Sequence, residues 1–345
     1  MRRATPRIVP IAATCAVGLL IILFGSSMLV GSGDVPIAES WRYALGDAQA
    51  RADAHLTMVM IDLRLPRTVV AIIAGACLGI AGCLLQSATR NPLAETGLLG
   101  VNAGAALCVV IGITILSIET APAILAFAFF GALAASALIM LIAGSAQQLS
   151  PLRLVLAGVA LSATFRGATS YILMSQPATY DRYRMWVLGS LSGVQFTQLV
   201  WVLPTVIAGI VIAALLTRPL GALSLGDDIA SALGHNPRLV RIGAAASVTL
   251  LTGATVSMCG PIAFLGLLAP YLARAIGGPK LGGQLLLSGL GGAAIMVAAD
   301  IAARVVLAPY EAPVSVLLAV IGGPLLILIV RTGRVLTLRA PGGAS

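Results

Sequence analysis

The chain has 345 residues, of which 59% are hydrophobic and only 10% are charged, and its mean hydropathy is +1.03. Soluble globular domains average about 25% charged residues, so this composition excludes them and indicates a polytopic membrane protein. The formal net charge of +9 does not indicate nucleic-acid binding, because the basic residues stand between apolar runs and not in blocks with interleaved aromatic residues.

Ten apolar runs are long enough, or nearly so, for a helix of about 20 residues that crosses the hydrocarbon core. The first follows Arg2, Arg3 and Arg7, but it is longer than the about 7 to 15 residues of a signal-peptide core, so we expect a retained span. The eighth is short and contains Pro270, which predicts a broken or partial helix covered by protein. The expected spans are 8–30, 66–86, 98–117, 121–145, 152–174, 197–216, 240–259, 262–276, 284–306 and 313–330.

The basic residues are divided unequally between alternate connections. If the N-terminus is cytoplasmic, 13 Lys and Arg residues lie on the inner side and 6 on the outer side, as the positive-inside rule requires. We therefore expect a multi-pass protein of the inner (plasma) membrane, with both termini cytoplasmic and residues 1–345 forming one transmembrane domain. The periplasmic connection 34–63 should hold an interfacial helix. The outer segment 175–195 is either a short helix at the membrane surface or a simple aromatic anchor.

The second span carries a face of small residues. Ala71, Gly75, Gly79 and Cys83 recur every four positions and so share one side of a helix. In lipid, such a face lets a second helix approach closely, and we expect this span to be packed inside the protein. The five cysteines lie within or beside apolar runs, with no CxxC pair, which indicates small buried hydrophobic residues and no metal site.

The connection 217–241 is the inner segment with enough length to fold. Asp227 and Asp228 can cap a short helix, Gly234 can end it, and Pro237 prevents its continuation. We expect one or two short cytoplasmic helices. The alternative is a solvated hairpin with no partner, which is less favoured because a permease needs such a segment and a channel usually does not.

Seven motifs occur in a fixed order along the chain: RLPR, a Gly-rich helix, NPLAE, LLGVNAGA, GPIAFLGLLAPYLAR, AADIAAR and EAPVSVLLAVIGGP. In this order they resemble the FecCD family, the permeases of ABC importers for iron-siderophores, haem and cobalamin, over roughly residues 8 to 335. Tyr271 stands where the family usually has His, and Ala312 and Ser315 depart from the usual ELPVG. These departures leave the subfamily and its substrate open.

The resemblance implies an all-α type II ABC importer permease fold with about ten transmembrane helices. It implies a homodimer, or a heterodimer with a related permease, around a central path. A periplasmic or lipid-anchored substrate-binding protein would dock on the outer face, where the family uses basic pockets. Carried over to this chain, the docking residues are Arg64, Arg67 and Arg304.

The resemblance also implies that 217–241 is the coupling loop for an ATP-binding subunit. Two copies of that subunit would bind at the inner face and hold ATP and Mg²⁺, while this chain would bind no cofactor. The implied coupling residues are Asp227, Asp228, Ser231, Ala232, Leu233, Gly234, His235 and Asn236.

Two sets of polar residues lie inside the spans. Asp300 and Arg304 are four positions apart on one helix face and can pair, which suits the cost of about 2.5 to 3.5 kcal/mol for a lone charge at mid-bilayer. Ser162, Arg166 and Ser170, also four apart, form a polar stripe that we do not take from the family. The stripe faces either a water-filled translocation path, where Arg166 would favour anionic substrates, or a buried hydrogen-bonded cluster.

The residue inventory argues against an enzyme and against ATP hydrolysis by this chain. His55 and His235, the only histidines, both lie in connections, so no Ser/His or metal arrangement forms within the spans. Lys280 is the only lysine and Leu281 follows it, which excludes a P-loop. Transport is therefore driven by a separate ATP-binding subunit or by an ion gradient. Ion coupling is the weaker reading, since Asp300 is the one mid-membrane carboxylate and stands beside a cation.

The sequence thus predicts the permease subunit of an ABC importer. Iron-siderophore is the first choice of substrate because it is the commonest in the family. Haem and cobalamin are the alternatives, and an ion-coupled secondary transporter is the less favoured class.

Overall fold

The computed structural model of the chain describes residues 8–32, 35–144, 151–308 and 310–331, and within these ranges every regular element is a helix. Seven helices are long and apolar enough to cross a membrane, and three shorter apolar helices accompany them, in agreement with the ten predicted spans. The ten are α1 (Ile8–Leu29), α5 (Leu65–Thr89), α6 (Val101–Ile115), α7 (Ala121–Gly144), α8 (Pro151–Ser175), α10 (Phe196–Leu215), α13 (Pro237–Cys259), α14 (Leu265–Gly277), α15 (Leu281–Val306) and α16 (Val314–Arg331).

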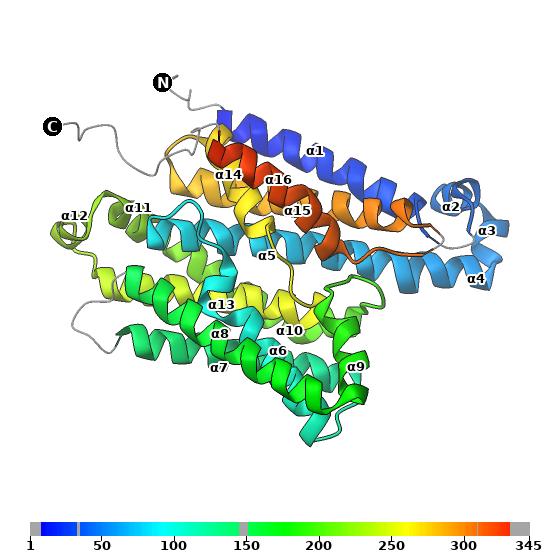
Figure 1. Cartoon of the computed structure of the whole chain (residues 1–345). Coiled ribbons are helices and arrows are strands. Elements are labelled where there is room, and N and C mark those ends of the chain that lie inside the picture. Colours follow the sequence, from blue (N-terminus) through cyan, green and yellow to red (C-terminus); the bar gives the residue numbers. More distant parts are fainter. Residues whose placement is uncertain (1–7, 33–34, 145–150, 309, 332–345) are drawn as a thin grey trace.

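Short helices gather at the two ends of this bundle (Figure 1). One end, which we call the α2 end, holds α2 (Ile37–Ala44), α3 (Ala48–Ala52), α4 (Ala54–Thr57), the π-helical segment η1 (Met58–Arg64) and α9 (Pro177–Val187). The opposite end, the α12 end, holds α11 (Thr217–Leu225) and α12 (Asp227–Ala232). Helix α1 begins and α16 ends at the α12 end, as an even number of crossings requires.

Capping residues account for the short helices at the α2 end. Asp47 and Asp53 are the N-caps of α3 and α4, and each carboxylate accepts two backbone N–H bonds. Arg42 donates to Asp47 at 2.8 Å, and this hydrogen bond, with those from the capped amides, holds the pKa of Asp47 below its ordinary value. The single interfacial helix predicted for 34–63 is therefore a series of short capped helices.

Helix α5 is the centre of the packing, and its small-residue face touches the backbone of α15 directly. A Cβ added to Gly75 would lie 2.7 Å from the Met296 Cβ, and one added to Gly79 would lie 2.8 Å from the Ser288 carbonyl carbon. The most apolar window of the α5 span is 72% buried, whereas that of α1 is 0% buried. The predicted packing role of this face is confirmed.

Three of the cysteines, including Cys83 on that face, are buried as predicted. Cys15 is exposed on α1, and Cys108 on α6 is half-buried. The prediction that all five are buried is therefore wrong for these two, because α1 and part of α6 present their side chains outward from this single chain.

The predicted break in the eighth span is confirmed. After α13 the chain runs without helix over 260–264, and Phe264 adopts a φ of +65° before α14 begins. The freed Phe264 N–H donates to Glu95 Oε1 at 2.8 Å, so protein satisfies a backbone donor that lipid could not. Pro270 lies inside α14, which has 13 residues.

The predicted caps of α12 differ from those observed. Gly226, with a φ of +138°, is the N-cap residue, and Asp227 and Asp228 lie in the first helical turn without a side-chain cap hydrogen bond. Asn236 caps the next helix, accepting from the backbone N–H of Arg238 at 3.0 Å, and Pro237 is its first residue. Pro237 therefore begins α13, because its fixed φ suits a first helical position.

Candidate docking, coupling and path sites

Five polar side chains form a buried network at the α2 end. Arg67 of α5 donates from Nε to Asp300 Oδ1 at 2.8 Å and from Nη1 to Glu311 Oε2 at 2.7 Å. Arg304 pairs with the other oxygen of Asp300, as the four-residue spacing predicts. The Ser32 hydroxyl donates to Glu311 Oε1 at 2.5 Å. The network joins the end of α1 to α5, α15 and the segment before α16.

Arg64 and Arg304 also satisfy carbonyl groups at the end of α1. Arg64 Nη1 donates to Met28 O and to Ser40 Oγ, each at 2.8 Å, and Arg304 Nη1 donates to Ser27 O at 2.9 Å. The last carbonyls of a helix lack partners within it and carry the negative end of its dipole. Both guanidinium groups therefore act as caps of α1, a role that the sequence did not indicate.

The three predicted docking arginines thus converge at one end of the molecule. In this single chain they are largely covered, with exposures of 5% for Arg64, 8% for Arg67 and 2% for Arg304. The Glu311 side chain, at 25%, is the more accessible member of its pair with Arg67. Docking through these residues stays a prediction.

A second charged cluster lies at the α12 end, around Asp227. Arg241 of α13 donates to both carboxylate oxygens at 2.8 Å. Arg90, the C-cap residue of α5, donates to Asp227 Oδ1 at 2.5 Å and to Leu223 O at 2.6 Å. The hydrogen bond from Arg241 is the main cause that holds the pKa of Asp227 below its ordinary value of 3.8, with Arg90 acting in the same direction.

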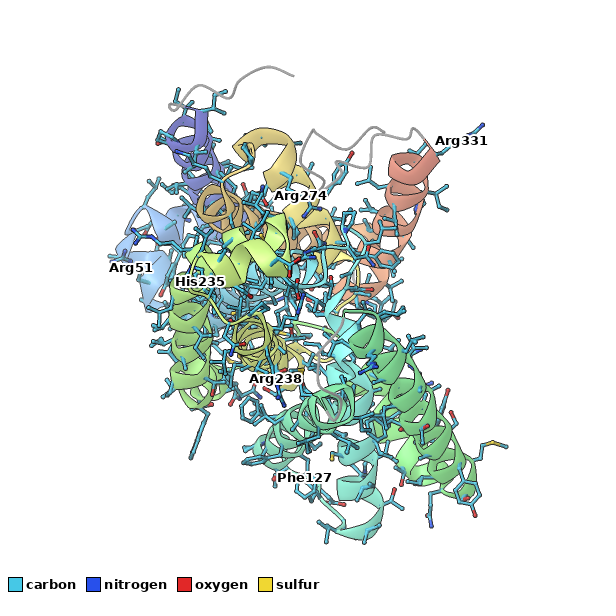
Figure 2. The ribbon with its side chains drawn as sticks, turned by 90° about the vertical axis from the view of Figure 1, so that its left-hand side faces the viewer. Arg51, Phe127, His235, Arg238, Arg274 and Arg331 are labelled. Carbon is cyan, nitrogen blue, oxygen red and sulfur yellow. The ribbon has the colours of Figure 1, made fainter. Side chains whose placement is uncertain are left out.

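The other predicted coupling residues lie around the turn that follows α12. Figure 2 looks onto this end, where His235 and Arg238 are labelled. Leu233 is 61% exposed, and His235 is half-buried. The members that are exposed are Asp228, Ser231, Ala232, Leu233, Gly234 and Asn236.

The polar stripe on α8 does not share one environment. Ser162 is 8% exposed, and its Oγ makes no hydrogen bond with the described residues. Arg166 and Ser170 are exposed on the open side of α8. That arrangement does not match a cluster buried within one chain, and the translocation path stays a prediction.

The NPLAE motif has a structural role that the sequence did not reveal. Besides the bond from Glu95 to the start of α14, the motif accepts a hydrogen bond at Ala94 O from Gln86 of α5, at 3.3 Å. Gln86 also accepts from Arg274 and donates to Gly266 O at 3.2 Å, both on α14. Arg274 is labelled in Figure 2. These contacts fix α14 against the end of α5.

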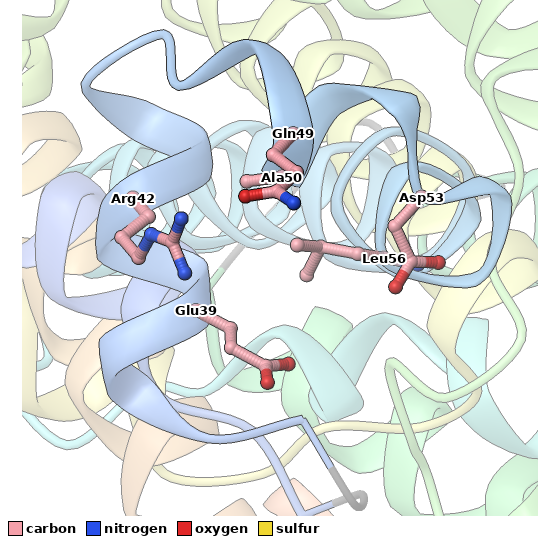
Figure 3. A pocket seen from close by; sticks show the side chains of 6 residues that line it. All are labelled: Glu39, Arg42, Gln49, Ala50, Asp53 and Leu56. Carbon is pink, nitrogen blue, oxygen red and sulfur yellow. The ribbon is translucent and has the colours of Figure 1, made fainter.

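A small hollow opens among α2, α3 and α4 at the α2 end (Figure 3). Its volume is about 130 Å³, whereas pockets for small molecules hold about 300 to 1,000 Å³. It is therefore too small to be the substrate site. Its lining residues are Glu39, Arg42, Gln49, Ala50, Asp53 and Leu56.

The fold defines a multi-pass helical membrane protein with a charged cluster at each end. Residues 19–332 match the FecCD transport family, and the chain belongs to that family. It is 44% identical over 316 residues to the ferric enterobactin transport system permease protein FepD of Escherichia coli (strain K12), covering 91% of this chain and 92% of that protein. It is 34% identical over 317 residues to the hemin transport system permease protein HmuU of Yersinia pestis, covering 89% and 91%.

A solved structure gives the same architecture. A chain described as an inward-facing conformation of a metal-chelate type ABC transporter superposes with a TM-score of 0.80 at 26% identity. The superposition covers 94% of this chain and 99% of that chain. The predicted family, all-α fold and transport class are confirmed.

Proposed function

We propose that the chain is the transmembrane permease subunit of an ABC importer, which carries an iron-siderophore or a related metal chelate across the inner membrane. The observation that carries the proposal is the identity of 44% to a ferric enterobactin permease over 91% of the chain. The chain is not itself an enzyme and binds no cofactor. A partner subunit holds ATP and Mg²⁺, in keeping with a sequence that contains no P-loop.

The α12 end faces the cytoplasm in this proposal, together with both termini, because the basic connections cluster there. The ATP-binding subunit docks on the coupling loop 217–241. Exposed apolar side chains support this contact, since Ile229 is 46% and Leu233 is 61% exposed in a segment outside the membrane.

The α2 end faces the periplasm, where the substrate-binding protein docks over Arg64, Arg67 and Arg304. A second permease copy, identical or related, lies along the open side of α8, so that Arg166 faces a water-filled path between the copies. An exposed arginine in a span of this kind would otherwise face lipid, which is costly. Its positive charge favours an anionic chelate.

Three other readings are the second candidates. Haem is favoured next because a hemin transport permease is 34% identical to this chain, and cobalamin follows from the family resemblance. Ion-coupled transport by the chain alone is less favoured, since the buried Asp300 already pairs with Arg67 and Arg304.

Uptake by vesicles tests the proposal. The chain is reconstituted with its ATP-binding subunit and binding protein, and labelled ferric siderophore, haem and cobalamin are offered in turn with and without ATP. We expect ATP-dependent uptake of the ferric siderophore that requires both partners. Proton-driven uptake by the chain alone would refute the proposal. Uptake of haem, without uptake of the ferric siderophore, would identify haem as the substrate.

Cross-linking tests the coupling contact separately. Ser231→Cys, in a Cys15→Ser background, places a thiol on the exposed side of α12. We expect a cross-link to a cysteine on the ATP-binding subunit in at least one nucleotide state. Absence of a cross-link in every state would remove the coupling role of this loop.

A further inference from the structure

One helix connects the two charged clusters. Helix α5 starts beside Arg64, carries Arg67 in its first turn and ends with Arg90 as its C-cap residue. It has 25 residues, so at a rise of about 1.5 Å per residue it is about 37 Å long. Because its glycines touch the backbone of α15, α5 has little freedom to bend. A force at one end of such a helix reaches the other.

The α12 end of this helix is attached to the coupling loop through Asp227. Both oxygens of its carboxylate are taken by Arg241 of α13, in a two-bond arrangement that fixes orientation as well as distance. Arg90 of α5 bonds the same carboxylate and also Leu223 O of α11. Asp227 is therefore the point at which α5, α11, α12 and α13 meet.

The neighbouring aspartate has no such attachment. Asp228 is exposed and makes no ion pair with any described residue, while the side chain of Arg241 is 7% exposed. Of the two acids that begin α12, one is bound inward to the membrane helices and the other is open to a partner.

We propose that Asp227 is a positioning residue, which clamps α12 to α5 and α13 so that movement of the coupling loop is transmitted along α5. The inference rests on the proposed function. It assigns Asp227, Arg90 and Arg241 to transmission inside the chain, and leaves the contact with the ATP-binding subunit to the exposed residues of the loop.

The test uses the reconstituted complex of full chain, ATP-binding subunit and binding protein. Asp227→Asn keeps the shape of the side chain and removes its charge, and Asp228→Asn is the matched control one position away. Four quantities are measured: the ATP-binding subunit that co-purifies, basal ATP hydrolysis, its stimulation by the loaded binding protein, and uptake per ATP hydrolysed.

We expect Asp227→Asn to co-purify with the ATP-binding subunit and to keep its basal hydrolysis. Stimulation and uptake per ATP should fall about tenfold, within the range of couplings measured between distant sites. Asp228 belongs to the exposed contact surface, so Asp228→Asn is compared per complex formed: it should keep stimulation and uptake per ATP in the complexes that co-purify. Asp227→Glu should restore much of the loss. The Asp227 side chain is 45% exposed, so solvent reaches its pair with Arg241 and the fold should persist. If the fold is lost, Arg90→Gln, which removes only the bonds from α5 to Asp227 and to Leu223 O, gives a second route.

An environment-sensitive probe reports the transmission itself. The probe is attached at Asn91→Cys, next to the end of α5, in a Cys15→Ser background. Its fluorescence should change when nucleotide is added to the complexes with otherwise wild-type sequence or with Asp228→Asn. It should not change in the complex with Asp227→Asn. Stimulation at the wild-type level in Asp227→Asn overturns the inference. The inference is also overturned if the amount of co-purified ATP-binding subunit falls by the same factor as stimulation, because Asp227 would then be a contact residue. A wild-type chain that binds no ATP-binding subunit overturns the proposed function, and the inference with it.

Discussion

Arg67 and Glu311 form an ion pair across 244 positions of sequence, with Nη1 and Oε2 2.7 Å apart. Glu311 therefore occupies an N–H group of Arg67 to which a carboxylate of a docking protein would have to bind. When Arg64, which caps α1 beside it, is counted with Arg67, Arg304, Asp300 and Glu311, the network carries a formal charge of +1. Docking at this site would require the incoming carboxylate to displace Glu311 or to bind beside it.

Glu311→Gln should therefore strengthen docking of the substrate-binding protein. The variant raises the network charge to +2 and leaves a neutral group opposite Arg67. We expect affinity to rise about threefold to tenfold at low salt, mainly through faster association, and the gain to shrink as salt is added. Binding to the detergent-solubilised chain measures this.

Glu119→Gln is the control for that comparison. Its carboxylate is 65% exposed and pairs with Arg182 at 2.8 Å, so it removes a comparable charge away from the network. If Glu311→Gln and Glu119→Gln bind the substrate-binding protein with equal affinity, Arg67 is not part of the docking site.

The pair with Arg67 also gives a pH dependence of stability. Burial disfavours the Glu311 carboxylate, but Ser32 and Arg67 outweigh it and lower the pKa of Glu311 below its ordinary value of 4.5. A lowered folded-state pKa stabilises the protein above the unfolded-state pKa, and this contribution is lost as the pH falls through the folded-state value. The difference in thermal midpoint between wild type and Glu311→Gln should be constant near neutral pH, begin to shrink near the ordinary pKa of 4.5, and vanish only when the pH is below the folded-state pKa of Glu311. A difference that changes between about pH 6 and pH 8 would contradict this assignment.

Removal of Arg67 should destabilise the chain strongly. Asp300 is fully buried, and Arg67→Ala takes away one of its two cationic partners. Breaking a buried pair in this way costs about 3 to 5 kcal/mol. The pair of Arg42 and Asp47, with 54% and 30% of the two side chains exposed, supplies the control, since Arg42→Ala should cost far less than Arg67→Ala.

Unfolding in mild detergent measures both variants, and a double-mutant cycle with Asp300→Ala isolates the pair. Equal effects of Arg67→Ala and Arg42→Ala would contradict the burial of the network. This cost also means that reversing Arg64 and Arg67 to Glu, which should abolish docking, must be accompanied by a measurement of folding.

The helices could be predicted closely because lipid leaves the backbone few choices. An apolar run of about 20 residues must satisfy its own hydrogen bonds, and only a helix does so. The observed α5, α13 and α15 begin within three residues of the expected spans. The small-residue face of α5 could be predicted equally well, because residues four positions apart share one side of the observed helix.

The contacts between distant segments could not be read from the sequence. The arginines were singled out by resemblance, but their bonds to α1 carbonyls and to Glu311 depend on how α1, α5 and α15 pack. Asp227 looked like a helix cap because capping is a local rule, whereas its bonds to Arg90 and Arg241 are made across the fold. Local rules say nothing about partners that lie 137 positions away.

Gly79→Ala should disturb the contact between α5 and α15. The added Cβ would lie 2.8 Å from the Ser288 carbonyl carbon, so the two helices must separate. Overpacking of this kind costs about 1 to 3 kcal/mol. Gly291→Ala on α15 is the control, because no atom of the neighbouring described residues lies within 4 Å of a Cβ added there, and alanine favours a helix. Thermal unfolding in detergent compares them, and equal stability of the two variants would contradict direct backbone contact.

Arg166→Ala should abolish or greatly reduce uptake without loss of the fold. Arg166 is exposed on the open side of α8, so its removal leaves no buried ion-pair partner unpaired among the residues that the structure describes. If it lines the path, the loss of its positive charge should lower uptake of an anionic chelate about tenfold, corresponding to about 1.4 kcal/mol. Arg166→Lys should keep most of the uptake, and Thr164→Ala, an exposed neighbour on α8, should keep all of it. Vesicle uptake is measured beside the amount of co-purified ATP-binding subunit. Wild-type uptake by a well-folded Arg166→Ala chain would show that α8 does not line the path with this residue.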